Sequence, residues 1–368
     1  MAFSLRITSQ RLIYTFNFVV LIYIIFVTHY LVSDKAWPQK QNVILLWTSY
    51  YGDSWKVEND LEVNLPMGNQ YFRNCSFQNC FLTTDRKLER HAAAIVFFDR
   101  DLMGHLMNFD LPDYQHRINS QRWVYYNIES PKNTYWLTSP FKSIIMFNWT
   151  MSYRRDSDVH AYYGSYGVRD YPSRSLGNVN YLASKKRFVA WMASSCLEDR
   201  TNFVYELSFH TEIDVYGSCG NRKCPRSREC WDKILRDYRF YLALENSYCI
   251  DYATEKLWNA LTHDVIPVVW GGADYHKTAP PNSFIDIRQF STVIDLANYL
   301  NRVGTDPKLY NSFFEWKIHW FIKPPQHWCN LCKKLNDRTQ PRKWYKLLDN
   351  LWDPLSSCFP NDYPRDIH

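Results

Sequence analysis

Residues 245–256 bring two carboxylates, an amide, a phenol and an amine close together in the chain. They are Glu245, Asn246, Tyr252, Glu255 and Lys256. Lys256 would stand in the first turn of a helix, where a cation opposes the helix dipole, whereas a bound phosphate would be favoured by both the dipole and the lysine. This arrangement therefore predicts an anionic ligand.

The elements that would position this cluster form a βαβ unit. Phe240–Leu244 is an apolar run of buried-strand length, and Val265–Trp270 is a second such run that stops at two glycines. Between them the apolar residues after Asp251, the expected N-cap, follow the i, i+4, i+7, i+8 spacing of a helix packed on one face. Ligands of open α/β sheets bind outside the carboxyl ends of the strands, which is where the polar cluster would lie.

Alternating strand-like and helix-like segments predict two α/β domains, at residues 42–183 and 184–368. In the first domain, strands are expected at 43–47, 94–98, 122–128 and 144–147. In the second domain, the strands expected in addition to the βαβ unit are at 187–193, 213–216 and 284–287. Helices are expected at 201–209 and 293–303, and the tryptophan-rich tail is expected to be mostly helical.

The N-terminus has the pattern of a signal anchor. Residues 12–32 are almost continuously apolar, and about 20 such residues span a bilayer. Arg6 and Arg11 precede them, so the tail 1–11 should stay cytoplasmic, with a short stem at 33–41. The rest would lie in the lumen, where N-glycosylation acceptors at Asn74 and Asn148 would be accessible.

All ten cysteines fall in this lumenal part, and an even number in an oxidising compartment predicts disulfides. Cys329 and Cys332 could instead be half of a zinc site, but no second close pair of suitable spacing accompanies them. The net charge of +6 is compatible with an anionic nucleotide and too weak for a nucleic-acid partner.

Glu129 is the candidate general base. It stands just after an apolar strand and before the turn at Pro131, so its carboxylate would face a cleft. The alternative is a strand-ending glutamate in solvent, since most glutamates are exposed.

FYLALENS, DYATEKLWNAL and VIPVVWGG closely resemble the donor-binding signature of the α1,3-fucosyltransferases. The N-x-E-S-P segment around Glu129 and YRRDSD at 153–158 are also similar, and the cysteine-rich segment YGSCGNRKCPRSREC looks most like invertebrate members. The resemblance implies a GT-B fold: two Rossmann-like domains with a cleft between them, the first binding the acceptor and the second GDP-fucose. The C-terminal helix of such enzymes crosses back to the first domain.

The resemblance also implies an activity: inverting transfer of fucose to the 3-hydroxyl of a GlcNAc, in an N-glycan core or a lactosamine antenna. Glu129 would be the base, Glu255 would steady the sugar, and Lys256 and Arg200 would neutralise the diphosphate. Asn246 and Tyr252 would contact the donor. Ser195 stands where the family has Asn, and the alternative for Arg200 is a surface salt bridge with Glu198 or Asp199.

Two Asp-x-Asp pairs, at 99–101 and 156–158, invite a metal hypothesis. Two carboxylates make a poor metal cage, and the resembling family supports the leaving group with basic residues. No obligatory metal is therefore expected, and Mn²⁺ or Mg²⁺ would only stimulate activity.

The expected location is the Golgi membrane, with the catalytic part in the cisternal lumen. The alternative hypotheses are a catalytically weak or inactive fucosyltransferase-like glycan-binding protein, a structural disulfide-rich membrane protein, and a protein O-fucosyltransferase or an enzyme that uses another sugar donor.

Overall fold

The computed structural model describes residues 41–52, 55, 65–138, 147–225, 228–341, 343–345 and 352–360. The predicted cytoplasmic tail, the membrane span at 12–32 and nearly all of the stem lie outside the described residues. Among the residues that are described, no helix is both long and apolar enough to cross a membrane. Those after Gln41 belong to one compact unit, Asn42–His368.

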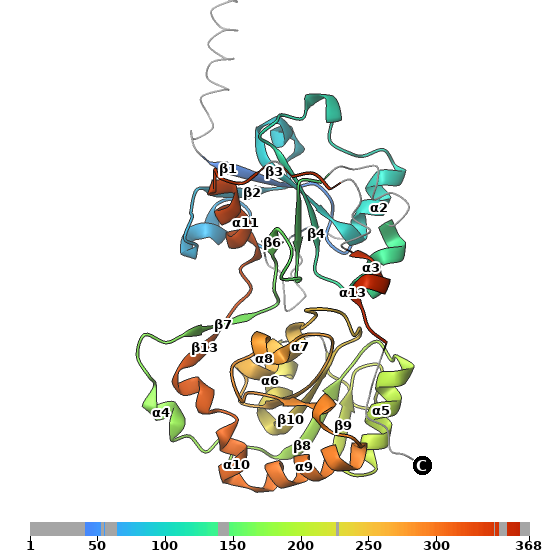
Figure 1. Cartoon of the computed structure of the whole chain (residues 1–368), viewed down its shortest axis with the longest axis vertical. Coiled ribbons are helices and arrows are strands. Elements are labelled where there is room, and N and C mark those ends of the chain that lie inside the picture. The colour runs from blue at the N-terminus through green and yellow to red at the C-terminus, as the bar shows by residue number, and fades with distance from the viewer. Residues whose placement is uncertain are drawn as a thin grey trace, which may run out of the picture. The chain divides into compact units, whose positions relative to one another are not determined.

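Six parallel strands form the first sheet, in the order β2-β1-β3-β4-β5-β6 (Figure 1). They are β1 (Asn42–Leu46), β2 (Cys80–Thr83), β3 (Ala92–Phe98), β4 (Arg122–Asn127), β5 (Trp149–Ser152) and β6 (Val159–His160). Helices α2 (Asp99–Met107) and α3 (Pro131–Thr138) follow β3 and β4. Strands β1, β3 and β4 are almost fully buried, as expected for parallel strands covered on both faces.

Five parallel strands form the second sheet, in the order β12-β11-β10-β8-β9. They are β8 (Arg187–Met192), β9 (Ile213–Tyr216), β10 (Tyr238–Leu244), β11 (Ile266–Trp270) and β12 (Ile285–Asp286). The chain places β9 on one side of β8 and β10 to β12 on the other, so the strand order reverses between β8 and β10.

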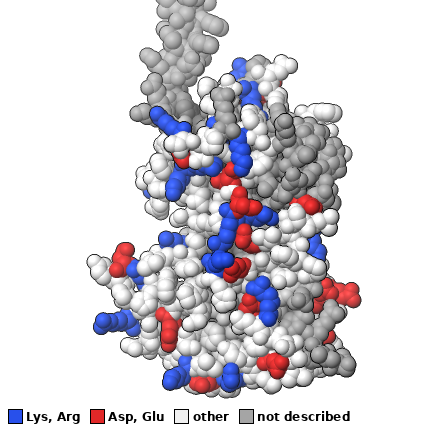
Figure 2. Space-filling view, in the orientation of Figure 1, with Lys and Arg blue, Asp and Glu red and all other residues white. Residues whose placement is uncertain are grey.

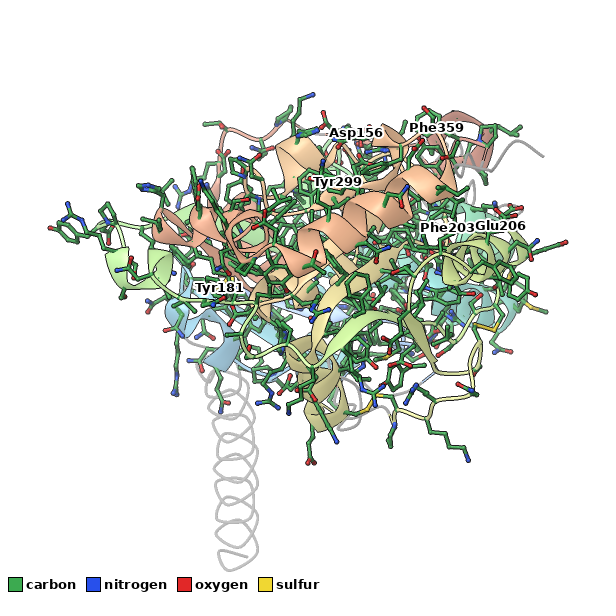
Figure 3. The ribbon with its side chains drawn as sticks, turned by 90° about the horizontal axis from the view of Figure 1, so that it is seen from below. Asp156, Tyr181, Phe203, Glu206, Tyr299 and Phe359 are labelled. Carbon is green, nitrogen blue, oxygen red and sulfur yellow. A yellow bond between two sulfur atoms is a disulfide. The ribbon has the colours of Figure 1, made fainter. Side chains whose placement is uncertain are left out.

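Helices cover both faces of the second sheet, and the two-residue period of β10 decides which side chain meets which helix. Phe240, Leu242 and Leu244 pack with α5 (Glu198–Ser208) and α9 (Val293–Thr305). Tyr241 and Ala243 point the other way, toward α6 (Arg228–Asp237), α7 (Glu255–Thr262) and α8 (Tyr275–Thr278). Figure 3 shows α9, which carries Tyr299, and α5, which carries Phe203 and Glu206, seen from below.

Two antiparallel strands, β7 (Ser165–Val168) and β13 (Trp320–Lys323), join segments on either side of the second sheet in the sequence. Short helices α4 (Arg174–Gly177) and α10 (Pro307–Ser312) lie near them in the chain. After β13 the chain returns to the first sheet, where α11 (His327–Asn336) buries Trp328, Leu331 and Cys332 in the core of that sheet. The expected return of a C-terminal helix is thus confirmed.

Five disulfides use all ten cysteines, which confirms the expectation of bridges. They are Cys75–Cys329, Cys80–Cys332, Cys196–Cys219, Cys224–Cys230 and Cys249–Cys358. The zinc alternative for Cys329 and Cys332 is wrong, because these cysteines form disulfides with Cys75 and Cys80. The last bridge ties the loop after β10 to the short helix α13 (Pro354–Ser357) at the C-terminus.

Two local expectations need comment. The strand expected at 144–147 lies, except for Phe147, outside the described residues, and the strand β5 at Trp149–Ser152 was not expected. Helix α7 begins at Glu255 with Thr254 as its N-cap, and not at Asp251, whose backbone is left-handed with φ of 61°. The predicted domain boundary at 183 and 184 falls between the two sheets and remains a prediction.

The two glycosylation acceptors differ in accessibility. Asn74 is exposed at the end of a 3-10 helix. Asn148 is only 2% exposed; its Oδ1 accepts the backbone N–H of Trp123 at 2.9 Å, and its Nδ2 donates to the carbonyl of Lys343 at 3.0 Å. In the folded chain Asn148 is therefore closed to a glycan.

The surface carries charges of both signs. Figure 2 shows basic and acidic side chains interspersed on the face in view, and neither sign dominates it. A nucleic-acid interface would present a basic stripe, which this face lacks.

Candidate active site

Arg200 marks the place where the strand order of the second sheet reverses. It lies in the first turn of α5 and is 4% exposed. Its Nη1 donates to the carbonyl of Leu244, the last residue of β10, at 3.0 Å, and its Nη2 donates to the carbonyl of Ser195, just after β8. The guanidinium thus joins the carboxyl ends of β8 and β10, where open α/β sheets bind ligands. The alternative of a surface salt bridge expected an exposed side chain, whereas this one is buried.

Glu245, directly after β10, is a buried carboxylate at the same edge, with 1% of its surface exposed. Its Oε1 accepts the backbone N–H of Thr254 at 2.8 Å, and its Oε2 accepts the Thr254 hydroxyl at 2.9 Å and the Lys256 ammonium at 3.1 Å. Gly271 makes room for it, since a Cβ on Gly271 would lie 3.0 Å from Cγ of Glu245. The first of the two glycines after β11 therefore has a packing cause.

Lys256 lies between two carboxylates, because Glu255 Oε1 is 3.2 Å from its Nζ. Burial by itself would lower the pKa of Lys256, but Glu245 and Glu255 outweigh it and raise the pKa well above its ordinary value. For Glu245 burial wins and raises the pKa. For Glu255 burial also acts upward, but the Lys256 charge and hydrogen bond prevail and lower the pKa.

The cation at the start of α7 is thus compensated by protein groups. Lys256 therefore does not by itself require an anionic ligand, although its charge opposes the helix dipole. The structure does show that the ammonium of Lys256 is fixed beside the N-terminus of α7. The neighbouring carboxylate of Glu255 has a side chain that is 35% exposed.

The loop between β10 and α7 carries the remaining predicted donor residues. Oδ1 of Asn246 is buried and meets no hydrogen-bond donor within the described part of the chain. Tyr252 is buried, and its hydroxyl donates to Oε1 of Glu129 at 2.5 Å. A residue predicted to contact the donor therefore contacts the predicted base.

Glu129 follows β4 and is half-buried. Its Oε1 also accepts the backbone N–H of Ser130 at 2.8 Å and Nδ2 of Asn133 at 3.1 Å. The Ser130 hydroxyl donates to the hydroxyl of Ser247, in the loop after β10, at 2.7 Å. The carboxyl ends of β4 and β10, from different sheets, therefore adjoin. The predicted base lies beside the loop between β10 and α7, which carries the residues predicted to bind GDP-fucose.

Sequence reasoning missed Asn133 and Thr254. Nothing local marks Asn133, which reaches Glu129 only because α3 follows it. Thr254 carried a signal, since threonine is a good N-cap, but Asp251 fitted the same rule.

The charged side chains of YRRDSD are largely paired. Arg154 donates to Asp156 at 2.8 and 2.7 Å. Arg155 lies near Asp251, with Nε 3.6 Å from Oδ1. Asp158 accepts from Tyr345 at 2.7 Å.

The first Asp-x-Asp pair is also bonded within the protein: Asp99 accepts from Asn127 at 2.8 Å and Asp101 from Ser49 at 2.6 Å. Among the described residues, no three His, Cys, Asp or Glu side chains group as metal ligands. The expectation that no metal is obligatory remains a prediction.

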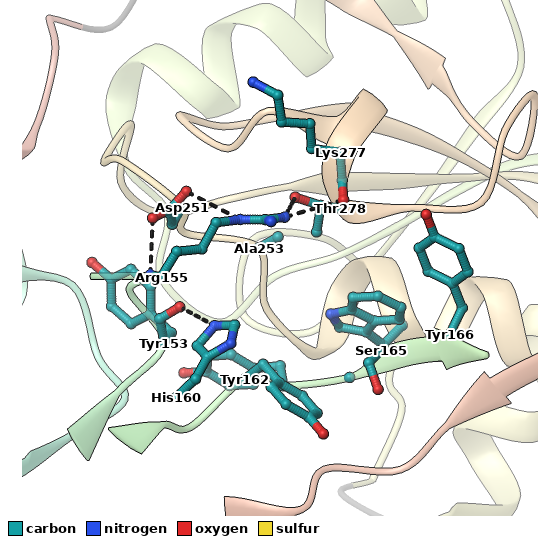
Figure 4. Close-up of a pocket in the computed structure, with 13 residues that line it drawn as sticks. Tyr153, Arg155, His160, Tyr162, Ser165, Tyr166, Asp251, Ala253, Lys277 and Thr278 are labelled. Atoms are coloured by element: carbon teal, nitrogen blue, oxygen red, sulfur yellow. Dashed lines mark hydrogen bonds and ion pairs between the residues drawn. The ribbon is translucent and has the colours of Figure 1, made fainter. Parts of the chain in front are cut away.

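A pocket of about 220 Å³ opens beside the Tyr252 loop (Figure 4). Asp251 and Ala253, the neighbours of Tyr252, line it together with aromatic side chains that include Tyr162, Tyr166 and Trp258. Figure 4 shows Arg155 reaching between Asp251 and Thr278, whose hydroxyl it meets at 3.1 Å. Its lining therefore combines aromatic faces with polar groups that already have partners.

Two family models match the chain. "Fucosyltransferase, N-terminal" covers residues 39–164, and "Glycosyltransferase family 10 (fucosyltransferase) C-term" covers residues 182–352. The chain belongs to glycosyltransferase family 10. The resemblance stated from the sequence is thereby confirmed, and the chain is placed among glycosyltransferases.

Curated relatives from insects and mammals are similar over most of this chain. Glycoprotein 3-alpha-L-fucosyltransferase A of Drosophila melanogaster is 34% identical over 307 residues, which are 80% of this chain and 59% of that protein. Alpha-(1,3)-fucosyltransferase C of the same fly is 33% identical over 357 residues, 89% of this chain and 80% of that one. A 4-galactosyl-N-acetylglucosaminide 3-alpha-L-fucosyltransferase 9 of Mus musculus is 33% identical over 87% of this chain and 83% of its own length.

The solved structure of an α1,3-fucosyltransferase with GDP-fucose matches with a TM-score of 0.51 at 15% identity, over 83% of this chain and 93% of that one. This likeness confirms the α/β fold. None of the comparisons supports the alternative of an inactive glycan-binding protein.

Proposed function

We propose that this chain transfers L-fucose from GDP-fucose to the 3-hydroxyl of a GlcNAc in glycoprotein glycans, with inversion at the anomeric carbon. The observation that carries the proposal is the 2.5 Å hydrogen bond between Tyr252 and Glu129, which brings the donor loop of one sheet to the candidate base after the other. Family membership and the names of the relatives support the same activity.

In the proposed reaction Glu129 takes the proton of the acceptor 3-hydroxyl. The acceptor oxygen then forms a bond to C1 of fucose from the side opposite the leaving group. The bond from C1 to the β-phosphate oxygen breaks, and its electron pair leaves on GDP. Negative charge therefore grows on the diphosphate, and positive charge on the sugar ring.

The second sheet supplies side-chain charges opposite to both of these growing charges. The raised pKa of Lys256 keeps its amine as an ammonium for the diphosphate, and Arg200 adds a second fixed positive charge where β8 and β10 end. The lowered pKa of Glu255 keeps a carboxylate next to the cationic sugar. The buried Oδ1 of Asn246 offers an acceptor for a donor hydroxyl.

The finer architecture belongs to this proposal: a GT-B arrangement in which the first sheet's side binds the acceptor and the second binds GDP-fucose. Catalysis is proposed to need no metal, with Mn²⁺ or Mg²⁺ at most stimulating. Residues 12–32 are proposed to anchor the enzyme in the Golgi membrane as a single-pass type II protein, supported by their apolar length and preceding arginines.

The test uses the full chain in detergent with GDP-fucose and two acceptors in parallel, a trimannosyl-chitobiose glycopeptide and a lactosamine. Fucose on the asparagine-linked GlcNAc would make it a core enzyme, and fucose on lactosamine an antennal one. Added EDTA should leave the rate above half of its original value. Tight GDP binding without transfer to either acceptor would contradict the proposed acceptors.

A further inference from the structure

The carboxylate of Glu129 is held from one side only. Three donors reach its Oε1: the backbone N–H of Ser130, Nδ2 of Asn133 and the hydroxyl of Tyr252. Within the described part of the chain, no hydrogen bond reaches Oε2. We infer that Tyr252 and Asn133 are positioning residues that fix Oε1 of Glu129 and leave Oε2 to take the acceptor proton.

The scaffold around Glu129 is fixed in the same way. Its backbone N–H donates to Oδ1 of Asn127 at 2.9 Å. The amide of that buried asparagine in turn donates to Asp99 at 2.8 Å and to Thr134 at 3.0 Å. Main chain and carboxylate are therefore both anchored, so the direction of Oε2 is determined before an acceptor arrives.

Tyr252 is itself rigidly placed. Its ring packs edge-on against Tyr153, with centroids 4.9 Å apart, and the preceding Asp251 accepts the backbone N–H of Arg155 at 3.0 Å. The hydroxyl thus has one direction available, toward the base. Since Tyr252 comes from the loop after β10 and Asn133 from α3, the base is oriented by both sheets' loops.

One consequence follows for the chemistry. A fixed Oε2 loses no orientational freedom when the acceptor binds, which raises kcat rather than the affinity for GDP-fucose. This role differs from a direct contact between Tyr252 and the donor, which would appear in the affinity for GDP-fucose.

The experiment compares Tyr252→Phe, Asn133→Ala and Tyr153→Phe in the full chain, measuring kcat, KM and GDP affinity. Tyr153→Phe is the matched control, because its buried hydroxyl meets no hydrogen-bond partner among the described residues. Losing a hydrogen bond to a charged group should lower kcat about tenfold or more in Tyr252→Phe, and somewhat less in Asn133→Ala. GDP affinity should be unchanged.

A second arm combines each change with Glu129→Gln. If the two residues act through Glu129, neither should lower the residual rate further. Unchanged kcat in both variants, a loss equal to that of Tyr153→Phe, or weakened GDP and GDP-fucose binding in Tyr252→Phe would overturn the inference. Asn133→Ala keeps the test valid if Tyr252→Phe fails to fold.

The inference rests on the proposed function, and the two fail differently. Absence of transfer by the unaltered chain would overturn the proposed function and this inference with it. Transfer by the unaltered chain, with kcat unchanged in Tyr252→Phe and Asn133→Ala, would overturn the inference alone.

Discussion

The carboxyl ends of the two sheets handle a glutamate in opposite ways. After β4, Glu129 is half-buried and, among the described residues, meets neutral donors that all reach one oxygen. After β10, Glu245 is 1% exposed and has both oxygens bonded, one of them to Lys256. The contrast separates the proposed base from a carboxylate that holds a cation.

The physical reason is desolvation. A buried carboxylate is stable only when its charge and lone pairs are satisfied, so Glu245 is tied to Lys256 and Thr254. A general base must keep an unoccupied lone pair, which requires access to solvent or substrate. The same residue type after the same kind of strand therefore takes two roles.

The largest expected effect comes from removing the base. Glu129→Gln keeps the shape and should lower kcat by about 10²–10⁴-fold, the range of general base catalysis. GDP affinity, measured by calorimetry, should not change, because the cationic cluster is intact. Retained kcat would show that the two glutamates do not differ in the way described.

The next effect tests the buried pair. Lys256→Met leaves Glu245 buried without its cation and should lower the free energy of unfolding by about 3–5 kcal/mol. Lys277→Met is the control, because that side chain is 74% exposed and its ion pair with Asp274 should contribute about 0–1 kcal/mol. Denaturant titration measures both, and equal losses would contradict the distinction.

A smaller effect separates the hydroxyl of Thr254 from its bulk. Thr254→Val removes the N-cap of α7 and a donor to Glu245, and should lower stability by about 1 kcal/mol with weaker GDP binding. Thr254→Ser keeps the hydroxyl and should restore both. A serine variant as weak as the valine variant would mean that packing, and not the hydroxyl, decides.

The smallest effect is the pH dependence of Glu255. Lys256 lowers the pKa of Glu255 in the folded chain despite burial. The contribution of Glu255 to the free energy of unfolding is therefore fully present above its pKa in the unfolded chain, about 4.3. This contribution is lost as the pH falls through the lower pKa of the folded chain. At pH 6 the free energy of unfolding of the unaltered chain should exceed that of Glu255→Gln by about 1 kcal/mol or less, because the partly exposed carboxylate is screened by solvent. The difference should shrink below pH 4, and a constant difference from pH 3 to 7 would contradict the assignment.

Local pattern was enough for most strands. The runs at β8, β9, β10 and β11 were predicted within two residues at either end, because strands buried on both faces need continuous apolar segments bounded by polar residues or glycine. β5 was missed because Trp149–Ser152 is less continuously apolar than the neighbouring run at 144–147. Strand β5 pairs with β4, where Val124 lies opposite Trp149, and the buried amide of Asn148 bonds the backbone of Trp123.

The helix start shows the same limit. Asp251 and Thr254 are both good caps by type. The choice falls on Thr254 because the carboxylate of Asp251 is taken by the backbone of Arg155, far away in the sequence, and that contact accompanies its left-handed backbone.

By itself the sequence determined the family, the parallel strands, the bridged state of the cysteines as a group and the polar residues at the strand ends. These depend on residue type and short spacing. Only the tertiary structure decided which cysteines pair, that Lys256 is compensated by Glu245 and Glu255, and that Tyr252 donates to Glu129. Each of these joins side chains whose distance is set by packing, because whether a charge is neutralised, or an oxygen is left available, depends on groups that the chain brings from elsewhere.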